Sequence, residues 1–162
     1  MILSIFTIVH VILSLVGIAS GLVVMAGLLT RKPLDGFNAL FLVTTVATSV
    51  TGFGFPFDRF LPSHGVGVLS LVVLGLALAA RYRFHLSGGW RKVYGICSVV
   101  ALYFNMFVLV VQSFQKVPVL RAAAPTQSEP PFVVVQSLVL VAFIVLGVLV
   151  ASRSRPEPLR AA

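Results

Sequence analysis

The sequence has little charge and little cysteine. Only 10% of its 162 residues are charged, and Asp and Glu together number 4. A soluble globular domain carries about 25% charged residues, so this composition cannot supply a solvated surface. The same figures exclude a disordered chain, a collagen and a disulfide framework. The single cysteine, Cys97, excludes an intrachain disulfide, a pair of redox cysteines and a thiolate zinc site.

Apolar residues dominate instead, at 59% of the chain, with a mean hydropathy of +1.08. The sequence therefore predicts an all-α polytopic membrane bundle in a single transmembrane domain, residues 1–162. A helix needs about 20 residues to cross the hydrocarbon core, and continuous apolar runs can span it only as helices. Five transmembrane helices are predicted, at residues 2–29, 37–57, 65–84, 93–114 and 132–151, with an outer loop at 115–131.

Two further absences refine this prediction. No apolar stretch contains Asp or Glu, and the nine prolines fall in connections, tails or the last turn of a span. Proline breaks a helix interior, so the spans are predicted to be uninterrupted. The first stretch has no basic leader and no cleavage site of the A-x-A type, so we interpret it as a retained helix.

The basic residues predict the orientation of the bundle. Cytoplasmic loops carry the excess of Lys and Arg, and the predicted loops divide these residues nine to three. One side holds Arg31, Lys32, Arg81, Arg83, Arg91, Lys92, Arg153, Arg155 and Arg160, and the other holds Arg59, Lys116 and Arg121. We therefore expect the N-terminus outside and the C-terminus inside. The net charge of +8 then reflects loops that face anionic lipid rather than nucleic acid.

Polar side chains within the predicted spans gather in the outer half of the bundle. Such residues are costly in a membrane and usually face the bundle interior or a wet cavity. We interpret six of them as a candidate polar pocket open to the periplasm: His10, His64, Asn105, Gln112, Lys116 and Gln136. His10 and Asn105 are candidates to hydrogen-bond each other, directly or through water.

Other polar and small residues leave two interpretations open. Gly17 and Gly21 share a helix face with His10 and predict close helix packing, although such a glycine pair also arises by chance. A stripe of threonines, Thr44, Thr48 and Thr51, either lines a pore or bonds to its own helix carbonyls. Asn105 and His10 are either interhelical glue or part of a ligand site.

The sequence predicts no catalytic residue and no metal site. No nucleophile motif or zinc-helix motif is present, and no His, Cys, Asp or Glu group has ligand spacing. A membrane haem requires two facing imidazoles, for which His10 and His64 are the only pair in one half of the bundle. The cofactor therefore stays open, with haem as one possibility.

One segment resembles a known group of proteins. The run from Gln115 to Pro118, followed by the run from Pro125 to Pro131, gives a QKVP…PTQSEPP pattern in the outer loop. This pattern is similar to that of small proteobacterial inner-membrane proteins to which no activity is attached. The resemblance extends over most of the chain and implies a multi-pass protein of the bacterial inner membrane.

Three functions are consistent with these observations. The first is a non-catalytic accessory subunit or homo-oligomer that acts through other membrane chains, within the lipid bilayer and without nucleic acid. The second is a small channel or transporter with the polar pocket facing the periplasm. The third is a redox protein that binds haem or quinone near His10.

Overall fold

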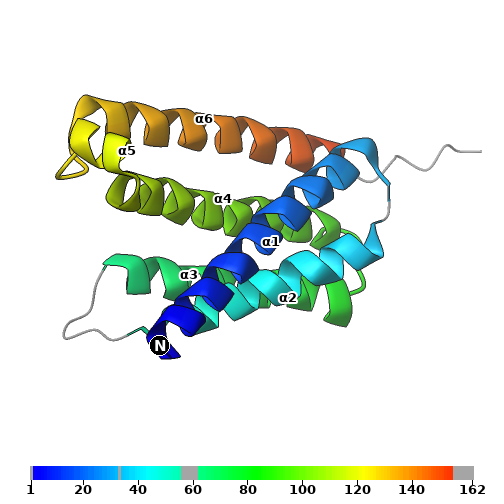
Figure 1. Ribbon diagram of the computed structural model, residues 1–162. Coiled ribbons are helices and arrows are strands. Elements are labelled where there is room, and N and C mark those ends of the chain that lie inside the picture. Colours follow the sequence, from blue (N-terminus) through cyan, green and yellow to red (C-terminus); the bar gives the residue numbers. More distant parts are fainter. Residues whose placement is uncertain (1, 33, 56–61, 155–162) are drawn as a thin grey trace, which may run out of the picture.

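The computed structural model describes residues 2–32, 34–55 and 62–154, and these residues form helices without any strand (Figure 1). The elements are α1 Ile2–Thr30, α2 Asp35–Gly52, α3 Pro62–Leu78, the π-helical turn η1 Ala79–Arg83, α4 Trp90–Lys116, α5 Pro118–Ala123 and α6 Pro130–Arg153. Figure 1 shows that each long helix runs in the direction opposite to that of the preceding long helix. We call the end where α1 begins the N-terminal end, and the end where α2 and α4 begin the basic end.

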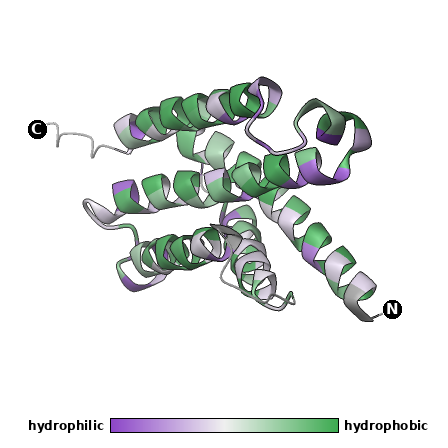
Figure 2. Ribbon diagram, turned by 90° about the vertical axis from the view of Figure 1, so that its left-hand side faces the viewer, coloured by the Kyte–Doolittle hydropathy of each residue, from purple (hydrophilic) through white to green (hydrophobic). Residues whose placement is uncertain are grey.

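Four of the described helices are long and apolar enough to cross a membrane: Ser4–Thr30, His64–Arg83, Trp90–Lys116 and Pro130–Arg153. Figure 2 shows apolar residues along these helices and hydrophilic ones mainly near their ends. By length and composition, these four helices indicate a helical membrane protein. The helix expected at 37–57 is the exception, because α2 ends at Gly52 and has only 18 residues, several of them polar.

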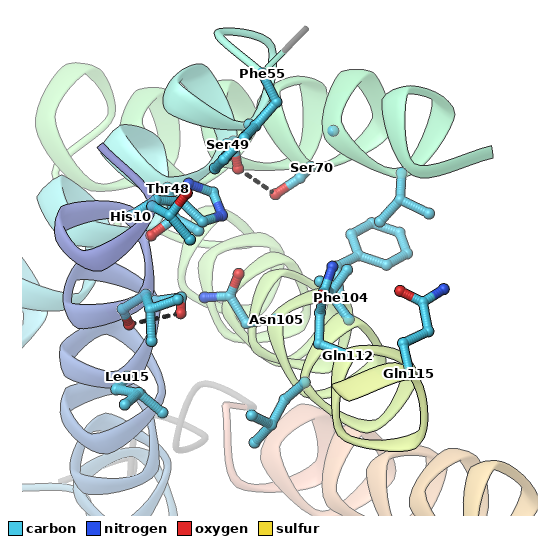
Figure 3. Close-up of a pocket in the computed structure, with 18 of the residues that line it drawn as sticks. His10, Leu15, Thr48, Ser49, Phe55, Ser70, Phe104, Asn105, Gln112 and Gln115 are labelled. Atoms are coloured by element: carbon cyan, nitrogen blue, oxygen red, sulfur yellow. Dashed lines mark hydrogen bonds between the residues drawn. The ribbon is translucent and has the colours of Figure 1, made fainter. Parts of the chain in front are cut away.

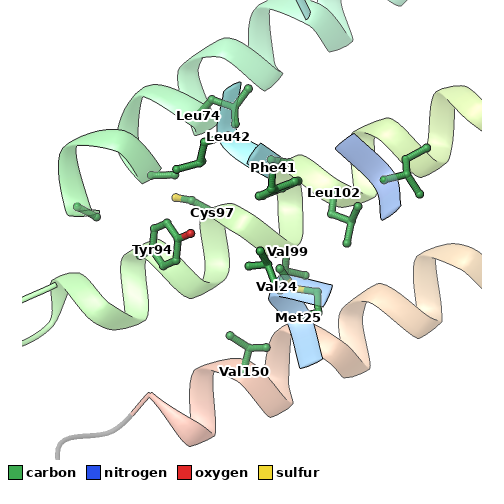
Figure 4. Packing of buried hydrophobic residues seen from close by; sticks show 14 residues of the cluster. Val24, Met25, Phe41, Leu42, Leu74, Tyr94, Cys97, Val99, Leu102 and Val150 are labelled. Carbon is green, nitrogen blue, oxygen red and sulfur yellow. The ribbon is translucent and has the colours of Figure 1, made fainter. Parts of the chain in front are cut away.

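The apolar core lies in the half of the bundle nearer the basic end (Figure 4). Helix α4 lies at its centre and contacts α1, α3 and α6. The fully buried side chains come from α1 to α4 and α6, and they include Val24, Phe41, Leu42, Leu74, Tyr94, Leu102 and Val150. Among the described residues, α4 buries more than any other helix, whereas α6 buries only Val150.

Two glycines allow α1 to approach its neighbours closely. A Cβ atom at Gly21 would lie 2.7 Å from Leu102 Cδ1 and 2.9 Å from the ring of Phe41. A Cβ atom at Gly17 would lie 3.2 Å from Thr45 Oγ1 and 3.4 Å from Asn105 Nδ2. The glycine face of α1 thus packs against both α2 and α4.

A polar network closes the basic end. Arg81, on the π-helical turn, forms an ion pair with Asp35 at the start of α2, and its guanidinium lies 5.4 Å from the ring centroid of Tyr94. The Tyr94 hydroxyl donates to Asn38 Oδ1 on α2. These contacts direct the Arg81 side chain toward α2 and α4. The turn between η1 and α4 is held by the stacked rings of Phe84 and Trp90, whose centroids are 3.9 Å apart.

The connection between α4 and α6 contains a short helix that the sequence did not predict. Helix α5 begins at Pro118, which is favoured at a first helical position because it needs no backbone donor there. Gln127 Nε2 donates to Val111 O at 3.2 Å, and the rings of Phe114 and Phe132 lie 5.4 Å apart. The loop is therefore folded onto the end of α4.

Candidate functional site

A cavity of about 650 Å³ lies between α1, α2, α3 and α4 in the half of the bundle nearer the N-terminal end (Figure 3). Its polar lining residues are Thr7, His10, Ser14, Thr48, Ser49, His64, Ser70, Asn105, Gln112, Ser113, Gln115 and Lys116. Its large apolar lining residues are Val11, Leu15, Phe53, Phe55, Val66, Phe104, Val108, Leu109 and Val117. Neither Asp nor Glu lines it among the described residues.

Five of the six residues predicted for the pocket line this cavity: His10, His64, Asn105, Gln112 and Lys116. The sixth, Gln136, does not. It lies on α6, where its Nε2 donates to Phe107 O on α4 at 3.2 Å and its Oε1 is buried without a partner. Gln136 is separated from the cavity because α6 packs mainly on α4 and, over the described parts of the helices, makes no substantial contact with α2 or α3.

His10 is anchored by α2. Its Nδ1 lies 2.8 Å from Thr51 Oγ1, and its ring meets the ring of Phe55 edge-on, with centroids 5.1 Å apart. The ring is partly buried and lines the cavity. Thr51 itself does not line the cavity, so it acts on the site through the orientation of His10.

Asn105 forms part of the buried floor. Its side chain is buried, and its Nδ2 donates to Thr45 Oγ1 at 3.4 Å. The expected direct hydrogen bond between His10 and Asn105 is not among the bonds of the described residues, because each side chain bonds to a different threonine of α2. Two serines complete the floor, with Ser49 Oγ and Ser70 Oγ 3.0 Å apart across α2 and α3.

The threonine stripe of α2 bonds mainly to its own helix. Thr44, Thr48 and Thr51 donate to the carbonyls four residues earlier, at 2.7, 2.8 and 2.7 Å. Of these three, only Thr48 lines the cavity. This back-bonding matches the second of the two interpretations left open by the sequence.

The cavity has two kinds of edge. At the bundle end, the exposed side chains of Gln112, Gln115 and Lys116 give it a polar rim. On the flank, Val11 and Leu15 line it while remaining 40% and 47% exposed, so the cavity also reaches the apolar outer surface of α1. A molecule in the cavity would thus find polar contacts at the rim and apolar contacts at the flank of α1.

The sequence did not predict the serine pair or the aromatic side chains of the cavity. Ser49, Ser70 and Phe104 are ordinary residues of apolar helices, and no local pattern marks which helix face each occupies. Phe53 and Phe55 follow the end of α2 in the structure. Because both are apolar, the sequence interpretation placed them inside the predicted span at 37–57. Within the described residues, no group of three His, Cys, Asp or Glu side chains is arranged to hold a metal ion.

Comparison with protein families, curated proteins and solved structures found no match to this chain.

Proposed function

We propose that the chain is a non-catalytic integral membrane protein that binds a small amphiphilic molecule in the interhelical cavity. The observation that supports this proposal is the lining of that cavity. It combines a polar floor, a polar rim and an opening onto the apolar flank of α1. A soluble polar ligand would not need the apolar opening, and a bulk lipid chain would not need the polar floor.

The size of the cavity supports a ligand rather than a packing defect. Protein interiors are packed about as densely as organic crystals, with few voids larger than a water molecule. Small-molecule sites have volumes of roughly 300–1,000 Å³ and combine apolar walls with a few placed polar groups. The cavity of about 650 Å³ falls within that range.

The first binding test identifies the molecules that stay bound to the protein when it is extracted from its own membrane. After purification in mild detergent, mass spectrometry is expected to find an amphiphile bound to the wild type and depleted from Asn105→Leu. Gln136→Leu is the matched control, because it also removes a side-chain amide, one that is partly buried and lies outside the cavity. Equal loading of the two variants, or no bound amphiphile in any sample, would contradict the proposal.

We further propose five membrane crossings in a bacterial inner membrane, with the N-terminus and the cavity on the periplasmic side. Helix α2 is included because its polar groups are satisfied inside the bundle: its threonines bond to helix carbonyls, Asn38 accepts from Tyr94, and Ser49 pairs with Ser70. The alternating helix directions in Figure 1 support this count.

Charge supports the orientation. Among the described residues, the basic end carries Arg31, Lys32, Arg81, Arg83, Arg91, Lys92 and Arg153, and the N-terminal end carries Lys116 and Arg121. The predicted cations Arg59, Arg155 and Arg160 lie outside the described residues.

Reporter fusions test the topology. A reporter active only in the cytoplasm is expected to work after Lys32 and at Ala162 and to fail at Ala123, and a periplasmic reporter should give the reverse pattern. If α2 did not cross the membrane, Lys32 and Ala123 would lie on the same side. Cytoplasmic activity at Ala123 would therefore contradict the five-span arrangement.

A second candidate function is that of a subunit in a membrane assembly. The observation behind it is the peripheral position of α6, which packs mainly on α4 and leaves large apolar side chains such as Leu138, Val141 and Val148 exposed to lipid or to a second chain. Light scattering in mild detergent should then report a protein mass that is a multiple of 17.3 kDa, or a co-purifying chain. A monomer without a partner would contradict this candidate and leave the ligand proposal intact.

A further inference from the structure

The chemistry of His10 identifies the kind of polar head that the cavity would hold. We propose that the ligand is a phenol-type amphiphile, an aromatic ring with a hydroxyl group and an apolar tail, whose hydroxyl donates a hydrogen bond to Nε2 of His10. This inference rests on the proposed binding function and specifies its ligand class.

The first step is the protonation of the imidazole. The Thr51 hydroxyl has a single proton, and its oxygen lies 2.7 Å from Ala47 O, where that proton completes a helix back-bond. Thr51 Oγ1 therefore accepts from His10 Nδ1, which lies 2.8 Å away. A neutral imidazole carries one proton, so Nε2 is left as a hydrogen-bond acceptor.

The second step is the position of that acceptor. His10 lines the cavity, and within the described part of the chain the only hydrogen bond of its ring is the one to Thr51. Figure 3 shows the ring on the cavity side of α1, opposite α4. A ligand that offers a donor would therefore find an acceptor without displacing a protein contact.

The third step is the surface beside the acceptor. Phe55 lies edge-on to His10, and Phe53 and Phe104 also line the cavity, so aromatic faces and edges are available to a ring. Val11 and Leu15 lead from the cavity to the apolar flank. A ring held beside His10 would thus have an apolar exit for its tail.

An anionic head is the competing ligand chemistry, because Lys116 is the one lysine or arginine that lines the cavity among the described residues. Lys116 is exposed at the last turn of α4. A lysine in that position interacts favourably with the helix carbonyls and reaches the headgroups, without any ligand. The buried floor contributes hydroxyl and amide groups rather than a further fixed positive charge, which favours the neutral head.

Three probes with the same tail separate these chemistries: 4-nonylphenol, 4-nonylanisole and 4-nonylbenzoate. The phenol donates a hydrogen bond, the anisole has the same ring without the donor, and the benzoate is an anion. Binding is measured at neutral pH by equilibrium dialysis against the protein in nanodiscs of phosphatidylcholine, with empty nanodiscs subtracted. We expect the phenol to bind about threefold to tenfold more tightly than the anisole.

Variants link the preference to one side chain. In His10→Gln the preference in affinity for the phenol over the anisole is expected to become smaller, because the acceptor nitrogen of the imidazole is replaced by an amide. In Thr51→Val the imidazole loses its anchor, and the preference is expected to weaken although Thr51 does not line the cavity. His85→Gln is the matched control, because it makes the same exchange in the connection at the basic end and should retain the preference.

Nitrogen NMR of histidine-labelled protein reads the protonation directly. The resonance of Nε2 in His10, assigned by its loss in His10→Gln, is expected at the position of an unprotonated nitrogen. It should shift on addition of the phenol more than on addition of the anisole. The shift is measured on the wild-type protein, so it remains informative if Thr51→Val folds poorly.

The outcomes distinguish this inference from the function on which it rests. Saturable but equal binding of phenol and anisole, or a protonated Nε2 in the free protein, would overturn the inference and keep an amphiphile site. Tighter binding of the benzoate that is lost in Lys116→Gln would also overturn it, in favour of an anion. If none of the probes bound saturably, the ligand class would be wrong, and the absence of any co-purified amphiphile would separately contradict the function.

Discussion

The close contact at Gly21 gives the sharpest prediction for stability. In Gly21→Ala the new methyl carbon would lie 2.7 Å from Leu102 Cδ1 and 2.9 Å from two ring atoms of Phe41. Carbon atoms in contact prefer separations of about 3.5–4.0 Å. Leu102 and Phe41 are fully buried and surrounded by the core, so neither side chain can move aside freely. The helices must therefore separate or the side chains must leave their preferred rotamers.

The size of the effect follows from a matched substitution. Overpacking a core typically costs about 1–3 kcal/mol. Replacing glycine by alanine within a helix also contributes about 1 kcal/mol in the opposite direction. Gly75→Ala isolates this second contribution, because Gly75 lies within α3 and a Cβ atom there would meet nothing within 4 Å. The difference between the two variants thus reports the clash alone.

The single cysteine supplies the assay. Cys97 is the only thiol of the chain and is 8% exposed, so a maleimide dye that fluoresces on reaction follows its exposure during heating. The clash corresponds to a melting temperature about 2–12 °C lower in Gly21→Ala than in Gly75→Ala. Gly17→Ala should fall between them, because its shortest Cβ contact is 3.2 Å. Melting of Gly21→Ala at or above Gly75→Ala would refute the close packing of α1.

Two further predictions concern the ends of the bundle. Tyr94→Phe leaves the buried Asn38 Oδ1 without its donor and should lower stability by about 1–3 kcal/mol in the same thermal assay, whereas Tyr82→Phe, at an exposed position, should change it little. For Glu129, desolvation alone would raise the pKa of the carboxyl, but N–H groups of Thr126 and Ser128 and the Thr126 hydroxyl outweigh it, so its pKa lies below the usual value. Its support of the loop should be complete above the ordinary pKa of glutamate and lost as the pH falls through the lowered value. Amide hydrogen exchange of Thr126 and Ser128 checks this, and an unchanged pH profile in Glu129→Gln would contradict it.

Helix positions were predictable where length and composition carry the information. The long apolar runs predicted α1, α4 and α6 within a few residues, because a membrane span needs a minimum length. The end of α2 was misplaced by five residues, since Phe53 and Phe55 are as apolar as the helix and only the chain turn distinguishes them. Helix α5 was missed because six residues in a proline-rich loop give no periodic signal.

The cavity residues were predictable to the extent that depth determines them. Polar side chains in the same half of several spans tend to meet, and five of the six candidates line one cavity. Gln136 lies at a comparable depth, but it contacts the α4 backbone instead of the cavity. The pairing of α6 with α4 is set by how the helices pack, which the sequence pattern does not show. The bond between His10 and Thr51 was likewise beyond sequence reasoning, since it depends on the crossing of α1 and α2.

That crossing also explains why the core and the cavity occupy opposite halves of the bundle. At Gly21, α1 touches Leu102 of the core, and one turn earlier, at Gly17, its contacts are the hydroxyls of α2 and Asn105. Further toward its N-terminus, Ser14 lines the cavity, as does His10 (Figure 3). Helix α1 runs obliquely across the other helices in Figure 1, so it diverges from them beyond its point of closest approach. The glycine pair therefore brings α1 close enough to pack the core, and the tilt that this contact permits leaves room for a ligand beside His10.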